Sequence, residues 1–151
     1  MNGVKYFSGT AAYSKEFVLP ERLTGADRRT ILGLGSVKNL AEVELNGHKV
    51  ALLWKLPFAA DVTGFLQPGK NRLVIRVTNL WVNRLIGDEQ RTIKDEEING
   101  WPKWVLADLP NSGTGHYTFS SWKGWGKDDF PFPSGLLGPV VLRAAELVKV
   151  K

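Results

Sequence analysis

The chain has 151 residues, no cysteine and a formal net charge of +5. Its length suits one ordinary domain, and its composition excludes disulfides, thiolate catalysis and cysteine-ligated zinc. The basic residues are scattered rather than clustered, so no nucleic-acid partner is predicted. No apolar run approaches the roughly 20 residues of a membrane helix, so no membrane partner is predicted.

Alternation of apolar and polar residues predicts two strands near the start of the chain. The first runs from Thr10 to Leu19 and ends at Pro20. The second covers residues 29–34. Gly33 and Gly35 mark a bulge or a close approach of two backbones there.

The strongest single signal is a hairpin centred on Asn46-Gly47. Residues 40–45 alternate strictly before this pair, and a second apolar run, residues 49–54, follows it. Asn-Gly tolerates the positive φ angles that a two-residue type I′ turn requires. The alternation points one set of side chains into the core, namely Ala41, Val43 and Leu45.

The next segments are a turn of helix, a tight turn and a strand. Residues 61–66 predict one helical turn with Asp61 as its N-cap. Pro68-Gly69 is typical of a tight turn. Residues 71–78 predict a strand whose core-facing side chains are Leu73, Ile75 and Val77.

The second half of the chain is less regular. Alternation fails from Gly87 to Gly115, which is typical of a functional or disordered loop. Residues 116–121 predict a strand, residues 121–137 a loop, and residues 140–142 and 145–148 closing strands. Short strands without a helix longer than two turns predict an all-β fold. We expect an antiparallel two-sheet β-sandwich with jelly-roll topology, forming one domain over residues 1–151.

Acidic pairs are the natural candidates for glycoside hydrolysis, which needs two carboxyl groups about 5–10 Å apart. Glu42 and Glu44 share the outer face of one strand, where solvated charges are the ordinary interpretation. Residues 95–97 and 128–129 are acidic loop runs that serve solubility or hold a structural calcium ion. Neither a nucleophile elbow nor metal-ligand histidine spacing accompanies them. No catalytic residue and no cofactor other than that calcium ion are predicted.

Tryptophan carries the remaining signal, because four of the six fall in irregular, Gly- and Pro-rich sequence. An indole ring can cover the C–H face of a sugar while polar side chains bind its hydroxyl groups. The alternative is that these rings cap the ends of the core, as expected for Trp54 and Trp81 at strand ends. The candidate carbohydrate-binding residues are Trp101, Trp104, Trp122, Lys123, Trp125, Asn83 and Arg84.

Several stretches resemble a known family. Two regions resemble the sugar-binding domain of family 2 glycosidases. One is Ser8–Phe17 (SGTAAYSKEF), and the other runs from Leu34 to Asn79 and contains VELNG, DVT and PGKNRL in order. Val77–Asp88 and Ser134–Val140 resemble the C-terminal β-sandwich of family 106 α-L-rhamnosidases. The resemblance implies a galactose-binding-like β-sandwich.

The resemblance also implies a function. It indicates a non-catalytic accessory module, excised from a rhamnosidase-like, polysaccharide-degrading glycoside hydrolase. Its partners would be a plant or microbial polysaccharide or oligosaccharide and the catalytic domain of the parent enzyme, with the chain itself a monomer. The alternative is a purely structural sandwich that supports the catalytic domain without binding sugar. An extracellular or periplasmic location is expected by resemblance, although residues 1–10 lack the apolar core of a signal peptide.

Overall fold

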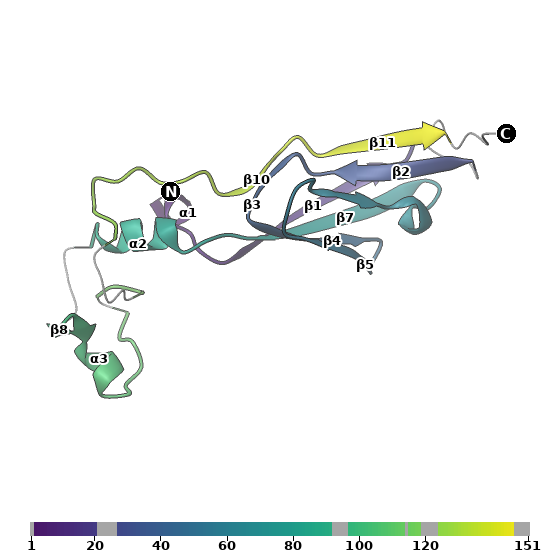
Figure 1. Ribbon diagram of the computed structural model, residues 1–151. Helices are drawn as coiled ribbons and strands as arrows, with labels where there is room; N and C mark the ends of the chain where they lie inside the picture. The colour runs from purple at the N-terminus through teal and green to yellow at the C-terminus, as the bar shows by residue number, and fades with distance from the viewer. Residues whose placement is uncertain (1, 21–26, 92–96, 114, 119–123, 147–151) are drawn as a thin grey trace. The chain divides into compact units, whose positions relative to one another are not determined.

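The computed structural model describes residues 2–20, 27–91, 97–113, 115–118 and 124–146 (Figure 1). The chain forms two compact units, each assembled from stretches that are far apart in the sequence. Unit 1 combines Met1–Gly9 with Leu80–Pro133, and unit 2 combines Thr10–Asn79 with Ser134–Lys151. The sequence itself shows no domain boundary between these units. That all of residues 1–151 act as a single module stays a prediction.

Unit 2 is a β-sandwich of antiparallel sheets (Figure 1). The larger sheet has the order β1 (Thr10–Val18), β7 (Lys70–Thr78), β4 (Leu40–Leu45) and β5 (His48–Leu53). The second sheet has the order β11 (Val141–Glu146), β2 (Arg28–Gly33) and β6 (Ala59–Asp61). A further pair joins β10 (Gly135–Gly138) to β3 (Ser36–Lys38). This arrangement confirms the predicted all-β, two-sheet sandwich.

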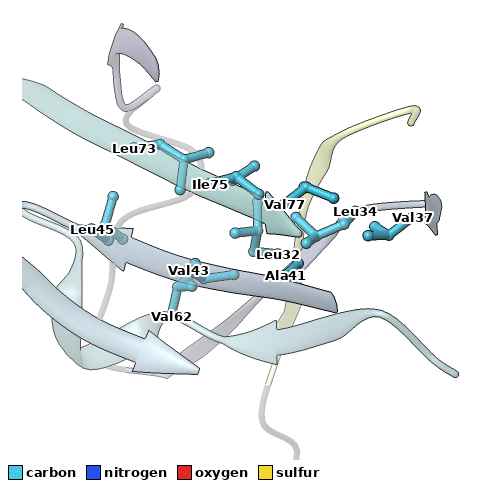
Figure 2. Packing of buried hydrophobic residues seen from close by; sticks show 10 residues of the cluster. All are labelled: Leu32, Leu34, Val37, Ala41, Val43, Leu45, Val62, Leu73, Ile75 and Val77. Carbon is cyan, nitrogen blue, oxygen red and sulfur yellow. The ribbon is translucent and has the colours of Figure 1, made fainter. Parts of the chain in front are cut away.

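The core of unit 2 lies between the sheets. Figure 2 shows its buried side chains, contributed by β2, β4, β7 and the segments beside them. The inward residues predicted for the two best strands are all buried there, which confirms both alternation patterns. The cluster consists of Leu32, Leu34, Val37, Ala41, Val43, Leu45, Val62, Leu73, Ile75 and Val77.

Backbone conformations confirm the glycine-based predictions. Asn46 has φ 52° and Gly47 has φ 83°, as the hairpin turn requires. Gly35 has φ 64°, and a Cβ placed on it would lie 2.3 Å from the carbonyl oxygen of Gly138. This position is the close backbone approach predicted from the glycine.

The short helical turn before β7 begins later than predicted. It is the 3₁₀ helix η2 (Thr63–Phe65), and its N-cap residue is Val62, so the assignment of Asp61 as N-cap is wrong. Asp61 still contributes a cap-like contact, because its Oδ1 accepts hydrogen bonds from the backbone N–H of Thr63 at 3.0 Å and from its hydroxyl at 2.6 Å. The side chain reaches past Val62 to the first helical residue.

The described residues of unit 1 form short helices and strands. These are α1 (Asn2–Lys5), α2 (Val82–Asp88), β8 (Glu97–Ile98), β9 (Trp101–Pro102) and α3 (Lys103–Leu106). No strand forms over residues 116–118, the described part of the predicted strand 116–121, because Thr118 is bonded to a side chain instead of a strand partner. None of the helices in the part that the structure describes is long and apolar enough to cross a membrane.

Candidate functional site

The predicted binding residues that the structure describes all lie in unit 1. Trp101 is 40% exposed in β9, and Trp104 is half-buried in α3. Trp125 is half-buried and meets the ring of Phe132 edge-on, with the centroids 5.2 Å apart. The described loop indoles therefore keep part of their surface accessible. Trp122 and Lys123 lie outside the described residues.

Asn83 has a structural contact rather than a free amide. Its Nδ2 donates to the carbonyl oxygen of Phe132 at 2.9 Å, and its Oδ1 accepts from the N–H of the same residue at 2.8 Å. The side chain is buried. Asn83 thus holds the segment that supports Trp125, and its placement does not support a direct sugar contact.

Arg84 lies beside an aromatic ring that sequence reasoning missed. Its guanidinium carbon is 5.1 Å from the centroid of the Tyr117 ring, and that of Arg91 is 4.3 Å from the same centroid. The Nη2 of Arg91 also donates to the carbonyl oxygen of Gly113 at 2.8 Å. Two cations are therefore gathered on one tyrosine, which is 55% exposed.

A buried carboxylate anchors the same tyrosine segment. Oδ2 of Asp88 accepts hydrogen bonds from the N–H of Thr118 at 2.8 Å and from its hydroxyl at 2.7 Å. Asp88 is only 2% exposed. Arg84, Asp88 and Arg91 are spaced at i, i+4 and i+7. This spacing could have indicated from the sequence that the three residues lie on one side of a helical turn. Nothing local in the sequence connects it to residues 117–118.

The expectation that Trp54 and Trp81 cover the core is wrong. They are 67% and 66% exposed. Trp54 follows the last residue of β5, and Trp81 stands just before α2, so neither occupies an inward strand position. The ammonium of Lys55 lies 5.3 Å from the Trp54 ring centroid.

The acidic pair on β4 has the environment of a surface ion pair. The Nη1 of Arg76 donates to Oε2 of Glu44 at 2.8 Å, and this contact lowers the pKa of the Glu44 carboxyl below its usual value. A general acid in glycoside hydrolysis needs a raised pKa instead. No group of three or more acidic or histidine residues suited to a metal ion occurs among the described residues. The calcium expectation at residues 95–97 and 128–129 stays a prediction.

Comparisons with known proteins agree with this fold. The family model described as "Glycosyl hydrolase 2 galactose-binding domain-like" matches residues 4–126. A Formosa agariphila protein named as a beta-glucuronidase is 47% identical over 144 residues, covering 91% of this chain and 12% of that protein. A rhamnosidase structure from Novosphingobium sp. PP1Y is 36% identical with a TM-score of 0.74, covering 96% of this chain and 12% of that one. The chain thus spans 12% of the length of each of these relatives.

Proposed function

The chain belongs to the glycosyl hydrolase 2 galactose-binding domain-like family, and from this premise we propose that it is a non-catalytic carbohydrate-binding module of a glycoside hydrolase. In this proposal the loop tryptophans of unit 1 stack on the sugar. The module works beside a catalytic domain that cleaves plant or microbial polysaccharide outside the cytoplasm, and it acts as a monomer. A rhamnosidase-like parent is the preferred context, because that similarity covers 96% of the chain.

One observation carries the proposal: the described part of unit 1 presents large aromatic rings at its surface. Trp101 is part-exposed in a two-residue strand, and Trp125 is supported from one edge by Phe132. A sugar ring gains from such a flat, rigid apolar surface because its own C–H face is apolar. Trp81 adds a further exposed indole to the same unit.

The absence of a catalytic role is part of the proposal and rests on the carboxylates. Glu42 and Glu44 lie two residues apart on β4, and the second is ion-paired with Arg76. A carboxyl group with a lowered pKa is ionised at neutral pH and cannot donate a proton to a leaving group. Cleavage is therefore assigned to another domain of the parent enzyme.

A second candidate is a structural module that supports the catalytic domain and binds no sugar. It is favoured by a different surface, at the end of β5 in unit 2. Leu52, Trp54 and Leu56 are all exposed there, close together in the chain. Large exposed apolar side chains in a group are typical of surfaces that contact another protein domain.

Affinity electrophoresis of the 151-residue chain in gels cast with neutral and acidic polysaccharides separates the two functions. The binding proposal predicts retention of wild type on at least one glycan. It also predicts loss of retention for Trp101→Ala or Trp125→Ala, with a melting temperature near that of wild type. Trp54→Ala is the matched control and should be retained like wild type. If no glycan retards the wild-type chain, or if the loop variants unfold early, the structural role is the correct one.

A further inference from the structure

The segment from Trp125 to Phe132 carries three aromatic rings around one tight turn. The backbone N–H of Asp129 donates to the carbonyl oxygen of Gly126 at 3.2 Å, and its Oδ2 accepts from the N–H of Gly126 at 2.7 Å. A turn closed by such a backbone bond brings the Cα atoms of its first and fourth residues within about 7 Å of each other. Trp125 and Phe130 flank those two residues, so they leave the turn as neighbours.

The turn and the residues after it are held at several points. The Nε2 of Gln90 donates to the carbonyl oxygen of Lys127, which lies in the turn. The side chain of Asn83 forms its two hydrogen bonds with the backbone of Phe132. Phe130 and Phe132 each precede a proline, which restricts their backbones to extended conformations. The chain is therefore held on both sides of Phe130.

The ring of Phe130 nevertheless lies almost entirely in water. Its side chain is 90% exposed, the highest value for a large hydrophobic residue in the described part of the chain. Trp125 is half-buried and is supported at 5.2 Å by the ring of Phe132. An apolar ring on a backbone that is already held loses little conformational freedom when a ligand covers it. The same turn thus presents two rings that a ligand can cover.

We propose that Phe130 is a second stacking ring beside Trp125, so that the module recognises at least two successive sugar residues of an oligosaccharide. This inference rests on the proposed carbohydrate-binding function and extends it from one sugar ring to a chain. Each aromatic ring covers the apolar C–H face of one pyranose, and the turn between the rings sets their spacing. A monosaccharide covers only one of the two rings and binds more weakly.

Affinity gels followed by titration calorimetry of the 151-residue chain test this inference. Gels cast with xylan, dextran, rhamnogalacturonan and polygalacturonate first identify a polysaccharide that retains wild type. The titrations then use the monosaccharide, the disaccharide and the trisaccharide prepared from that polysaccharide. Affinity should rise by about tenfold from the monosaccharide to the trisaccharide, because the longer ligand covers a second aromatic ring.

Phe130→Ala should weaken binding of the trisaccharide by about tenfold and binding of the monosaccharide by no more than about twofold, because Trp125 remains. Phe130→Tyr keeps a flat ring and should bind like wild type. Phe130→Leu keeps an apolar side chain without a flat face and should bind like the alanine variant. Because Phe130 is so exposed, these variants should melt at the wild-type temperature.

The matched control is Trp54→Ala, which removes a 67% exposed ring from unit 2 and should leave all three affinities unchanged. If Phe130→Ala binds the trisaccharide like wild type while Trp125→Ala does not, the inference is wrong and the tryptophan-based function stands. Equal wild-type affinities for the monosaccharide and the trisaccharide, or equal losses for Phe130→Ala and Trp54→Ala, would overturn it as well. Retention on none of the four polysaccharides would instead remove the proposed function itself, together with this inference.

Discussion

The side-chain amide of Asn46 donates a hydrogen bond to the side-chain oxygen of Asn71 at 2.8 Å, which joins the β4–β5 turn to the start of β7. Asn71 also accepts from the backbone N–H of Gln67 at 3.0 Å and donates to the carbonyl oxygens of Gln67 and Gly69 at 2.8 and 3.0 Å. Its side chain is buried. One amide thus satisfies three backbone groups and fixes the turn leading into the best strand of the sandwich.

Replacing this amide should be among the most damaging single changes in unit 2. Asn71→Ala removes the partner of the backbone N–H and carbonyl of Gln67 and one of the two donors to the carbonyl of Gly69, which keeps its bond from Leu19. We expect a loss of about 3 kcal/mol in the free energy of unfolding. Urea denaturation followed by circular dichroism measures it. Gln67→Ala is the control, because its exposed side chain makes one bond, to Lys70, and should cost less than about 1 kcal/mol. Equal effects of the two variants would contradict this account.

The Asn46-Gly47 turn could be predicted because its chemistry is local. Positive φ at two successive residues is a property of the dipeptide itself, and strict alternation on either side sets which residues face inward. The bond from Asn46 to Asn71 could not be predicted in this way, because it joins residues 25 positions apart. Only the assembled sheet, which places β4 beside β7, brings them together.

Replacing glycine by alanine should change the free energy of unfolding in opposite directions at two glycines in helical segments. Alanine normally stabilises a helix relative to glycine, by about 0.4–1 kcal/mol through the unfolded state. At Gly64, in η2, no atom lies within 4 Å of the added methyl, so that gain should appear. At Gly87, in α2, the methyl would lie 2.5 Å from Cβ of Tyr6, and the clash should cost about 1–3 kcal/mol.

Thermal melts of Gly64→Ala and Gly87→Ala, measured side by side, compare the two signs directly. The melting temperature should rise for the first variant and fall for the second. A rise for both would mean that Tyr6 does not pack against α2. Helix propensity alone would then determine the effect of alanine on stability at both positions.

Asp61 makes the stability of unit 2 dependent on pH in the acid range. Hydrogen bonds from Thr63, followed by the contact with Arg29, lower the pKa of this carboxyl to about 2. The ordinary value in an unfolded chain is about 3.9. Because the folded-state pKa is the lower one, the stabilisation is complete above about pH 4 and is lost as the pH falls towards 2.

The matched variant is Asp61→Asn, which removes the charge but keeps the shape. At pH 7 its urea midpoint should lie below that of wild type, and the two midpoints should converge as the pH approaches 2. A direct NMR titration of the carboxyl carbon should give a midpoint near 2. A midpoint near 4, with no convergence of the urea curves, would show that the contacts to Thr63 and Arg29 are weak in solution.

The residue types of the candidate site could be predicted from the sequence, but their arrangement in space could not. Tryptophans in irregular, Gly-rich sequence indicated the region, because such sequence does not build a regular core. The partnership of Arg84 with Tyr117 was not visible, since the two residues are 33 positions apart and no periodic pattern relates them. Trp54 illustrates the opposite error. A large apolar side chain at a strand end was expected to cover the core, yet it is 67% exposed.

Asn83 should act on sugar binding through position and not through contact. Its paired bonds with the backbone of Phe132 hold the ring that meets Trp125 edge-on. Asn83→Ala leaves both backbone groups unpaired, and we expect a loss of about 2 kcal/mol in the stability of this segment. Hydrogen exchange should report it, with the amide of Phe132 losing its protection.

Asn83→Asp is the graded comparison, because a carboxylate still accepts from the N–H of Phe132 but no longer donates to its carbonyl oxygen. If Asn83 positions Trp125, retention on the bound glycan should fall in proportion to the exchange of the Phe132 amide, with the aspartate variant between alanine and wild type. If Asn83 instead contacts the sugar, retention falls in both variants while the amide stays protected. That result would mean that Asn83 contacts the sugar directly and that the segment at Phe132 opens on binding.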